Sequence, residues 1–148
     1  AVKSFGVQSR FVHFEFFRLT QDHAYLGKKG RIIGLEVNYR PSGGFTPDMI
    51  NYACSTDVYK DWADMVAFDR LTKADYPDKY YCVSAGCRKE KHYLHSYEEV
   101  MAEYKDDIMM TTELPEVLAS AMGDRLYLAR FAEKEAMDAF ISYVFATA

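Results

Sequence analysis

Residues 31–44, RIIGLEVNYRPSGG, contain a strand signal that is followed at once by a break. β-branched and apolar residues favour a strand over residues 31–39, and a proline and two glycines then stop it. Residues two apart on a strand share one face, so Glu36, Asn38 and Arg40 are expected to point the same way. The stretch therefore predicts a strand that carries a carboxylate, a carboxamide and a guanidinium on one side.

A second strand is predicted just upstream, over residues 11–19, FVHFEFFRL, which are rich in aromatic and β-branched side chains. A polar region over residues 20–30 separates the two strands. If they pair antiparallel about a centre near Gly27, Glu15 falls close to Glu36 or Asn38, with Cβ atoms of opposed residues ~5 Å apart. A slip of one residue would turn Glu15 to the other face.

Two helices are predicted after the break. Thr46 and Pro47 are typical of a helix start and favour a helix over residues 47–53, and Asp57 is among the residues that can cap a helix over 58–68. Four apolar side chains of the second helix recur at helical spacing and are expected to face a core. They are Tyr59, Trp62, Met65 and Val66.

A polar stretch with a proline, residues 73–79, is the expected boundary between a part spanning 1–72 and a small α+β lobe spanning 73–148. Strands are predicted over 80–84, 91–95, 108–110 and 126–131, and helices over 97–104, 115–121 and 133–145. Phe140, Ile141 and Val144 of the last helix are expected to pack onto the strand at 126–131. The fold class expected is α+β, mainly antiparallel sheet with flanking helices.

The composition limits the classes of function. The 148 residues carry a net charge of −4, with 18 basic and 22 acidic side chains dispersed along the chain. Such a balance argues against a nucleic-acid or membrane-surface partner, and no apolar run approaches the ~20 residues of a membrane span. Three cysteines fit a reducing compartment. The expectation is a soluble cytoplasmic protein, and the abrupt start at residue 1 favours a piece of a longer chain.

The polar face of the first hairpin fits a divalent cation. Two carboxylates on neighbouring strands repel each other, so a cation between them is favourable. Oxygen atoms of Glu15, Glu36 and Asn38 are the ligands that Mg²⁺ accepts, with its other positions taken by water and substrate phosphates. Arg40 can donate two hydrogen bonds to a phosphate. The same alternation also fits an open sheet face whose charges are simply solvated.

The motifs FVHFEFFRL and GLEVNYRPSGGFTPDMINYA resemble the C-terminal catalytic half of ATP-grasp ligases, such as the carbamoyl-phosphate synthetase large chain and biotin carboxylase, over about residues 5–70. In this family a Glu in an aromatic-flanked strand precedes an E-x-N-x-R motif. Glu15 matches the first Glu, Glu36 and Asn38 match E-x-N, and Arg40 matches the Arg. The resemblance implies that Glu15, Glu36 and Asn38 bind Mg²⁺ or Mn²⁺ on the phosphates of ATP.

The resemblance also implies an activity for the parent enzyme. A carboxylate substrate would take the γ-phosphate of ATP, and an amine or another nucleophile would capture the acyl phosphate. Arg40 would act on the phosphoryl group, and a loop that includes Ser42, Gly43, Gly44 and Thr46 would receive the substrate. The family's glycine-rich loop and phosphate-binding lysines are not seen in this sequence. The missing N-terminal part of the same protein is therefore an expected partner, and this chain alone is expected to be inactive. The sequence does not determine whether the protein forms homo-oligomers.

The sequence also fits two other interpretations. A non-catalytic binding module could keep the ATP-grasp fold without its nucleotide lid. Independently, the spacing C-x₄-C-x₄-H-x₂-H could hold zinc, although it departs from the usual structural sites. Its residues are Cys82, Cys87, His92 and His95. The same segment also fits a plain hairpin with Gly86 near its turn.

Overall fold

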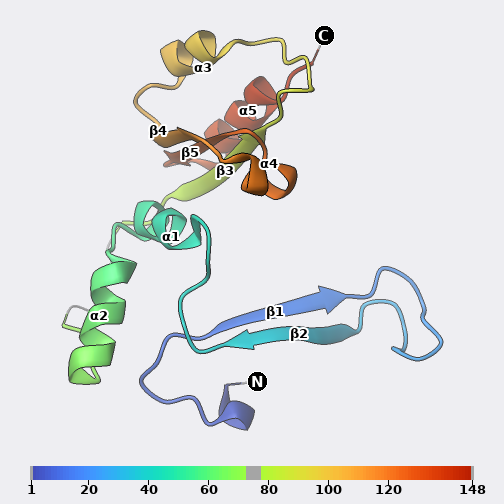
Figure 1. The fold of residues 1–148 in the computed structure, drawn as a ribbon, viewed down its shortest axis with the longest axis vertical. Helices are drawn as coiled ribbons and strands as arrows, with labels where there is room; N and C mark the ends of the chain where they lie inside the picture. The colour runs from blue at the N-terminus through green and yellow to red at the C-terminus, as the bar shows by residue number, and fades with distance from the viewer. Residues whose placement is uncertain (1, 73–77, 148) are drawn as a thin grey trace. The chain divides into compact units, whose positions relative to one another are not determined.

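The computed structural model describes residues 2–72 and 78–147. Within these ranges the chain forms five α-helices and five strands, and the strands make one two-stranded and one three-stranded antiparallel sheet (Figure 1). The predicted α+β class with antiparallel sheets is confirmed. The chain divides into two compact units, one of Ala1–Pro47 and Asp57–Ala74 and one of Asp48–Thr56 and Asp75–Ala148. The predicted boundary at 73–79 falls largely outside the described residues.

The first unit is built on the predicted hairpin. A short 3₁₀ helix, Lys3–Phe5, precedes β1 (His13–Arg18), which pairs antiparallel with β2 (Ile32–Asn38). Backbone hydrogen bonds of 2.8–2.9 Å between Leu19 and the Gly30–Arg31 peptide region close the loop end of the hairpin. A β-bulge interrupts the register next to Glu15, which marks this position as the irregular point of an otherwise simple ladder.

Helix α2 (Val58–Phe68) has the predicted bounds, because Asp57 caps its N-terminus and accepts a hydrogen bond from the Lys60 amide at 3.0 Å. The prediction that its aromatic face is buried is wrong: Trp62 is 43% exposed and Val66 65%. The buried side chains of α2 are instead Val58, Asp61 and Asp64.

A polar network explains this orientation of α2. The Lys60 ammonium donates to Asp64 at 2.6 Å, and the Thr72 hydroxyl also bonds to the same carboxylate. The hydrogen bonds from Lys60 and Thr72 lower the pKa of Asp64. A carboxylate with these partners can be buried at small cost, so the Asp64 side of the helix turns inward and the apolar side turns outward.

The second unit contains α1 from Asp48 onward and a three-stranded sheet. Helix α1 (Thr46–Cys54) begins one residue before the predicted position. Strand β5 (Arg125–Phe131) is central, between β3 (Tyr81–Cys87) and β4 (Ile108–Glu113), and both pairings are antiparallel. Being central, β5 is almost wholly buried, which fits its apolar composition.

Helix α5 (Lys134–Val144) covers this sheet and completes the core, as predicted. Phe140 and Val144 are 0% and 2% exposed in a core cluster that includes side chains of β5, and Ile141 packs against this cluster. Helix α3 (Tyr97–Glu103) adds Val100 to the same cluster, and Ser96 and Glu99 form a capping box at its start. Helix α4 (Glu116–Met122) links β4 to β5.

The predicted strand over residues 91–95 is wrong. This segment is a loop that makes a single bridge between Tyr93 and Thr147, and the Lys91 amide donates to the Arg88 carbonyl in a turn. The hairpin expected with its turn near Gly86 is also wrong, because Gly86 lies inside β3, opposite Leu126 of β5. Strand β3 finds its partner far along the chain instead of in the next segment.

Candidate functional site

The hairpin brings the two predicted glutamates together. Glu15 of β1 lies directly opposite Glu36 of β2, and His13 lies opposite Asn38. Directly opposed residues of an antiparallel pair point to one face, and so do residues two apart on a strand. The four polar side chains therefore share a face at the open end of the hairpin, as the sequence predicts for Glu15, Glu36 and Asn38.

Each carboxylate on this face is held by a neighbour on its own strand. The His13 Nε2 atom lies 3.2 Å from the Glu15 Oε1 atom, and the Asn38 carboxamide nitrogen donates to the Glu36 carboxylate. The Glu15 side chain is 43% exposed, so water reaches the site. The four side chains thus form two facing pairs, His13 with Asn38 and Glu15 with Glu36, and neither carboxylate has an ion pair with Lys or Arg among the described residues.

His13 is the residue that the sequence reasoning missed. Its Nδ1 atom is buried and has no hydrogen-bond partner among the described residues. A buried polar atom without a partner is costly, so such an atom points to a role or to a ligand that completes it. The signal in the sequence was its spacing: His13 precedes Glu15 by two, as Glu36 precedes Asn38.

Arg40 lies beyond the end of strand β2. Strand β2 ends at Asn38, so the alternation of the strand does not determine where Arg40 points. Its guanidinium donates to the Pro41 carbonyl at 2.9 Å and lies beside Gly43. Gly44 has a φ of 60°, which glycine adopts without strain.

The remaining members of the predicted substrate loop, Ser42 and Thr46, lie in the same connection: Ser42 is half-buried, and Thr46 begins α1. The loop that follows Arg40 therefore brings one glycine, Gly43, next to its guanidinium.

The residue types on this face, although not their present arrangement, match the ligands of a hard divalent cation. Two opposed carboxylates, a carboxamide and access to water are what Mg²⁺ uses, since it keeps several water ligands. The adjacent imidazole of His13 would favour Mn²⁺ over Mg²⁺ as a direct ligand. In the side-chain arrangement of the described residues, no three His, Cys, Asp or Glu side chains are gathered closely enough to hold an ion. Binding would require the two carboxylates to turn from their neighbours toward each other.

An aromatic hollow of about 290 Å³ lies beside Glu36. The Phe14 ring packs between those of Phe5 and Phe16, with centroid distances of 5.9 and 6.0 Å. Neither Glu15 nor Asn38 lines this hollow. The polar face and the hollow are therefore two separate features of the hairpin that meet at Glu36.

The zinc interpretation does not fit the structure. Cys82 and Cys87 lie five residues apart on the unbroken strand β3, so they are on opposite faces and about 16 Å apart. The ring of His95 stacks on that of Tyr143 at 3.6 Å. Burial raises the pKa of both thiols. The two cysteines cannot ligate one ion, and neither has the lowered pKa that a nucleophilic cysteine needs.

Comparison of the chain with protein-family models, with curated proteins and with solved structures finds no match. Among the described residues, the longest helices have 11 residues, and none has the length and apolar character that crossing a membrane requires.

Proposed function

We propose that the first unit is the metal- and phosphate-binding part of an ATP-dependent ligase that joins a carboxylate to an amine or another nucleophile, and that it works in the cytoplasm. The observation that carries the proposal is the position of Glu15 directly opposite Glu36, with Asn38 on the same face. Three oxygen-bearing side chains at one end of a hairpin form a polar floor for two divalent ions. The resemblance of the two strands to ATP-grasp ligases supplies the reaction class.

The roles of the residues follow from their chemistry. Glu15 and Glu36 would hold the ions once Glu36 turns from its hydrogen bond with Asn38, and the Asn38 carboxamide oxygen would complete one ligand shell. Bound Mg·ATP supplies the phosphoryl group that activates the carboxylate substrate. Phosphoryl transfer depends mainly on positioning and on neutralising charge, so carboxylates that fix cations and a guanidinium near the phosphate suffice. Arg40 and the Gly43–Gly44 turn would contact the phosphoryl group or the substrate.

Isothermal titration calorimetry of the 148-residue chain tests the proposed division of the ATP site between this chain and the rest of the enzyme. We expect weak or no heat of ATP binding with Mg²⁺ present, because the floor holds the ions but the groups that cover the nucleotide belong to the rest of the enzyme. Micromolar affinity for ATP would refute this division.

In the complete enzyme, Glu36→Gln should abolish ATP turnover, because it removes one negative charge from the site while keeping the shape. Glu135→Gln, on the exposed side of α5, is the matched control and should leave turnover unchanged. Near-normal turnover of Glu36→Gln would remove Glu36 from the site. Circular dichroism of both variants separates a lost function from a lost fold.

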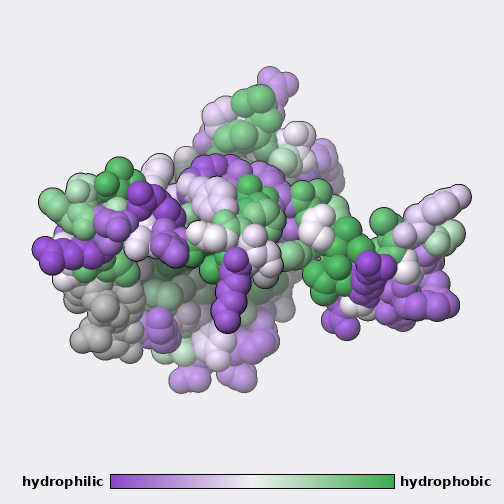
Figure 2. All heavy atoms as spheres, turned by 90° about the horizontal axis from the view of Figure 1, so that it is seen from below, coloured by the Kyte–Doolittle hydropathy of each residue, from purple (hydrophilic) through white to green (hydrophobic). Residues whose placement is uncertain are grey.

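A second candidate is a non-catalytic interaction module, and the exposed apolar surface of the first unit favours it. Phe16, Phe17 and Ile32 of the hairpin are 52–59% exposed, and α2 exposes Trp62 and Val66. Hydrophobic atoms are visible at the surface along the hairpin arm in Figure 2. A module of this kind would bind its partner without metal, so Glu36→Gln would leave complex formation intact while Trp62→Ala would weaken it.

A further inference from the structure

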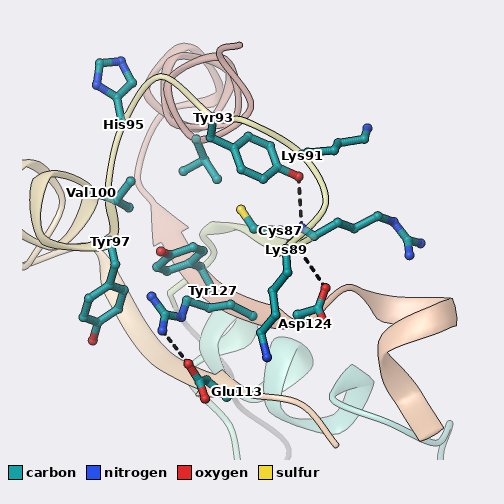
Figure 3. A pocket seen from close by; sticks show the side chains of 13 residues that line it. Cys87, Lys89, Lys91, Tyr93, His95, Tyr97, Val100, Glu113, Asp124 and Tyr127 are labelled. Carbon is teal, nitrogen blue, oxygen red and sulfur yellow. Dashed lines mark hydrogen bonds and ion pairs between the residues drawn. The ribbon is translucent and has the colours of Figure 1, made fainter. Parts of the chain in front are cut away.

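A pocket in the second unit has an aromatic interior and a basic rim. Its volume is about 270 Å³, near the lower end of the ~300–1,000 Å³ typical of small-molecule sites. In Figure 3 the rings of Tyr93 and Tyr127 and the Cys87 sulfur surround its centre, whereas His95 points away. Tyr127 and Val100 are 3% and 2% exposed, so the interior is formed by residues that the core holds in place.

The wall of the pocket is fixed by hydrogen bonds. The Arg88 amide donates to the Tyr93 hydroxyl at 3.1 Å, and the Lys89 amide donates to the Asp124 carboxylate at 2.8 Å (Figure 3). The Asp124 amide in turn donates to the Cys87 carbonyl at 2.7 Å. These bonds hold the turn after β3 against the start of β5, so the pocket exists before a ligand arrives.

A second wall combines aromatic and charged groups. The rings of Tyr97 and Tyr127 stack with centroids 6.2 Å apart, and the Arg125 guanidinium lies 4.2 Å above the Tyr97 ring. Arg125 also forms an ion pair with Glu113 at 2.6 Å. Glu113 therefore neutralises the positive charge of Arg125, and the main role of Arg125 is to hold Tyr97 and Tyr127 in place.

The positive charge at the rim of the pocket is not neutralised by nearby carboxylates. Four Lys and Arg side chains and two carboxylates line the pocket, in a chain whose net charge is −4. Arg88 donates to the neutral carbonyls of Ala119 and Ser120. Neither the Lys89 nor the Lys91 ammonium has a carboxylate within 4 Å in the described part of the chain. Flat apolar walls below surplus cations suit a flat apolar body that carries a negative charge.

We propose that this pocket binds a small organic anion, an aromatic ring bearing a carboxylate or a phosphate, with the ring against the half-buried Tyr93 and over the floor that Tyr127 forms, and with the anionic group facing Lys89 and Lys91. The half-buried Tyr93 ring supplies stacking area, the buried Tyr127 gives an apolar floor, and the flexible lysines can swing onto the anion. The Cys87 thiol contributes as an apolar contact, because burial raises its pKa and keeps it protonated. The site is independent of the ligase proposal.

Titration of the 148-residue chain, followed by amide NMR shifts, tests this site with four probes: benzoate, phenyl phosphate, benzyl alcohol and inorganic phosphate. We expect one or both aromatic anions to shift the amides of residues 87–93 and 124–127, and comparison of the two shows which anionic group the rim prefers. Benzyl alcohol should bind at least tenfold more weakly, and inorganic phosphate should not shift these amides. Equal affinity for benzyl alcohol, or no binding of either aromatic anion, would overturn the proposal.

Two pairs of lysine substitutions test whether Lys89 and Lys91 bind the anion. Lys89→Gln combined with Lys91→Gln should weaken the aromatic anions at least fivefold, whereas Lys28→Gln combined with Lys29→Gln, which makes the same change of net charge in the first unit, should not. Both pairs are exposed, so both variants should fold. An equal effect of the two pairs would show a general electrostatic attraction and overturn the site.

The chain also contains an internal reporter. Cys82 and Cys87 are half-buried thiols on one strand, but only Cys87 lines the pocket. A saturating aromatic anion should slow alkylation of Cys87 at least threefold, as read by mass spectrometry of the peptides, and leave Cys82 unchanged. Equal protection of both, or of neither, would contradict binding in this pocket.

Discussion

Replacing Gly86 by Ala tests how closely β3 packs against the end of α4. A Cβ atom at Gly86 would lie 1.9 Å from the Met122 carbonyl oxygen, whereas real Cβ atoms essentially never come within 3.0 Å of such an atom. The obstacle is backbone, so no side chain can turn aside, and one of the two segments must move by about 1 Å. That movement would also strain the neighbouring hydrogen bond, which the Asp124 amide donates to the Cys87 carbonyl.

The cost of this movement can be worked out. Overpacking a well-packed site costs roughly 1–3 kcal/mol, and a weakened buried hydrogen bond adds about 1 kcal/mol. We therefore expect Gly86→Ala to lower the free energy of unfolding of the second unit by about 3 kcal/mol. For a unit of this size, that corresponds to a fall in melting temperature of about 12 to 24 °C.

Urea denaturation gives the free energy of unfolding, and hydrogen exchange of the Leu128 amide in β5 reports the second unit alone. Ser84→Ala, at an exposed position of the same strand, should change stability by less than about 0.5 kcal/mol. Gly34→Ala in β2 meets nothing within 4 Å and should leave the first unit unchanged or slightly more stable. A Gly86→Ala protein as stable as Ser84→Ala would refute the close approach.

Three further predictions concern the second unit. Phe140→Ala should destabilise it by about 3–5 kcal/mol in urea denaturation, because the ring is fully buried in the core; a loss below 1 kcal/mol would contradict that burial. Burial raises the pKa of Cys87 above its value in the unfolded chain, so the alkylation rate of the folded protein should have its midpoint at a higher pH than that of the urea-unfolded chain. The stability that the neutral thiol contributes should be lost as pH rises through the folded pKa; a midpoint at or below that of the unfolded chain would contradict the burial. Ser96→Ala should cost about 1 kcal/mol by removing the capping box of α3, whereas an exposed Glu98→Gln in the same turn should cost little.

Much of the local structure could be predicted from the sequence. The bounds of α2 follow from Asp57, and the pairing of β1 with β2 follows from alternation and a polar connection. These features depend on residues close together in the chain. Helix capping, the turn residues and the alternation of side chains along a strand therefore determine them. The facing of Glu15 and Glu36 belongs to this group, because a hairpin converts a short sequence distance into a defined register.

The features that could not be predicted depend on distant residues. The loop at 91–95 has strand-like composition, but its backbone pairs with residues near the C-terminus, Tyr93 with Thr147 and Leu94 with Ala146, instead of with β3. The orientation of α2 depends on Asp64 finding Lys60 and Thr72. The tyrosine pocket is lined by residues of α3, α5, β3, β4 and β5, so no single stretch of sequence contains its pattern.

Binding of Mn²⁺ to the 148-residue chain tests the central claim most directly. Paramagnetic Mn²⁺ broadens the amide signals of residues near the bound ion. The account predicts broadening centred on Glu15, Glu36 and Asn38, with affinity at least tenfold weaker in Glu15→Gln and Glu36→Gln and unchanged in Glu135→Gln. No broadening at these residues, or broadening that survives both hairpin substitutions, would contradict it.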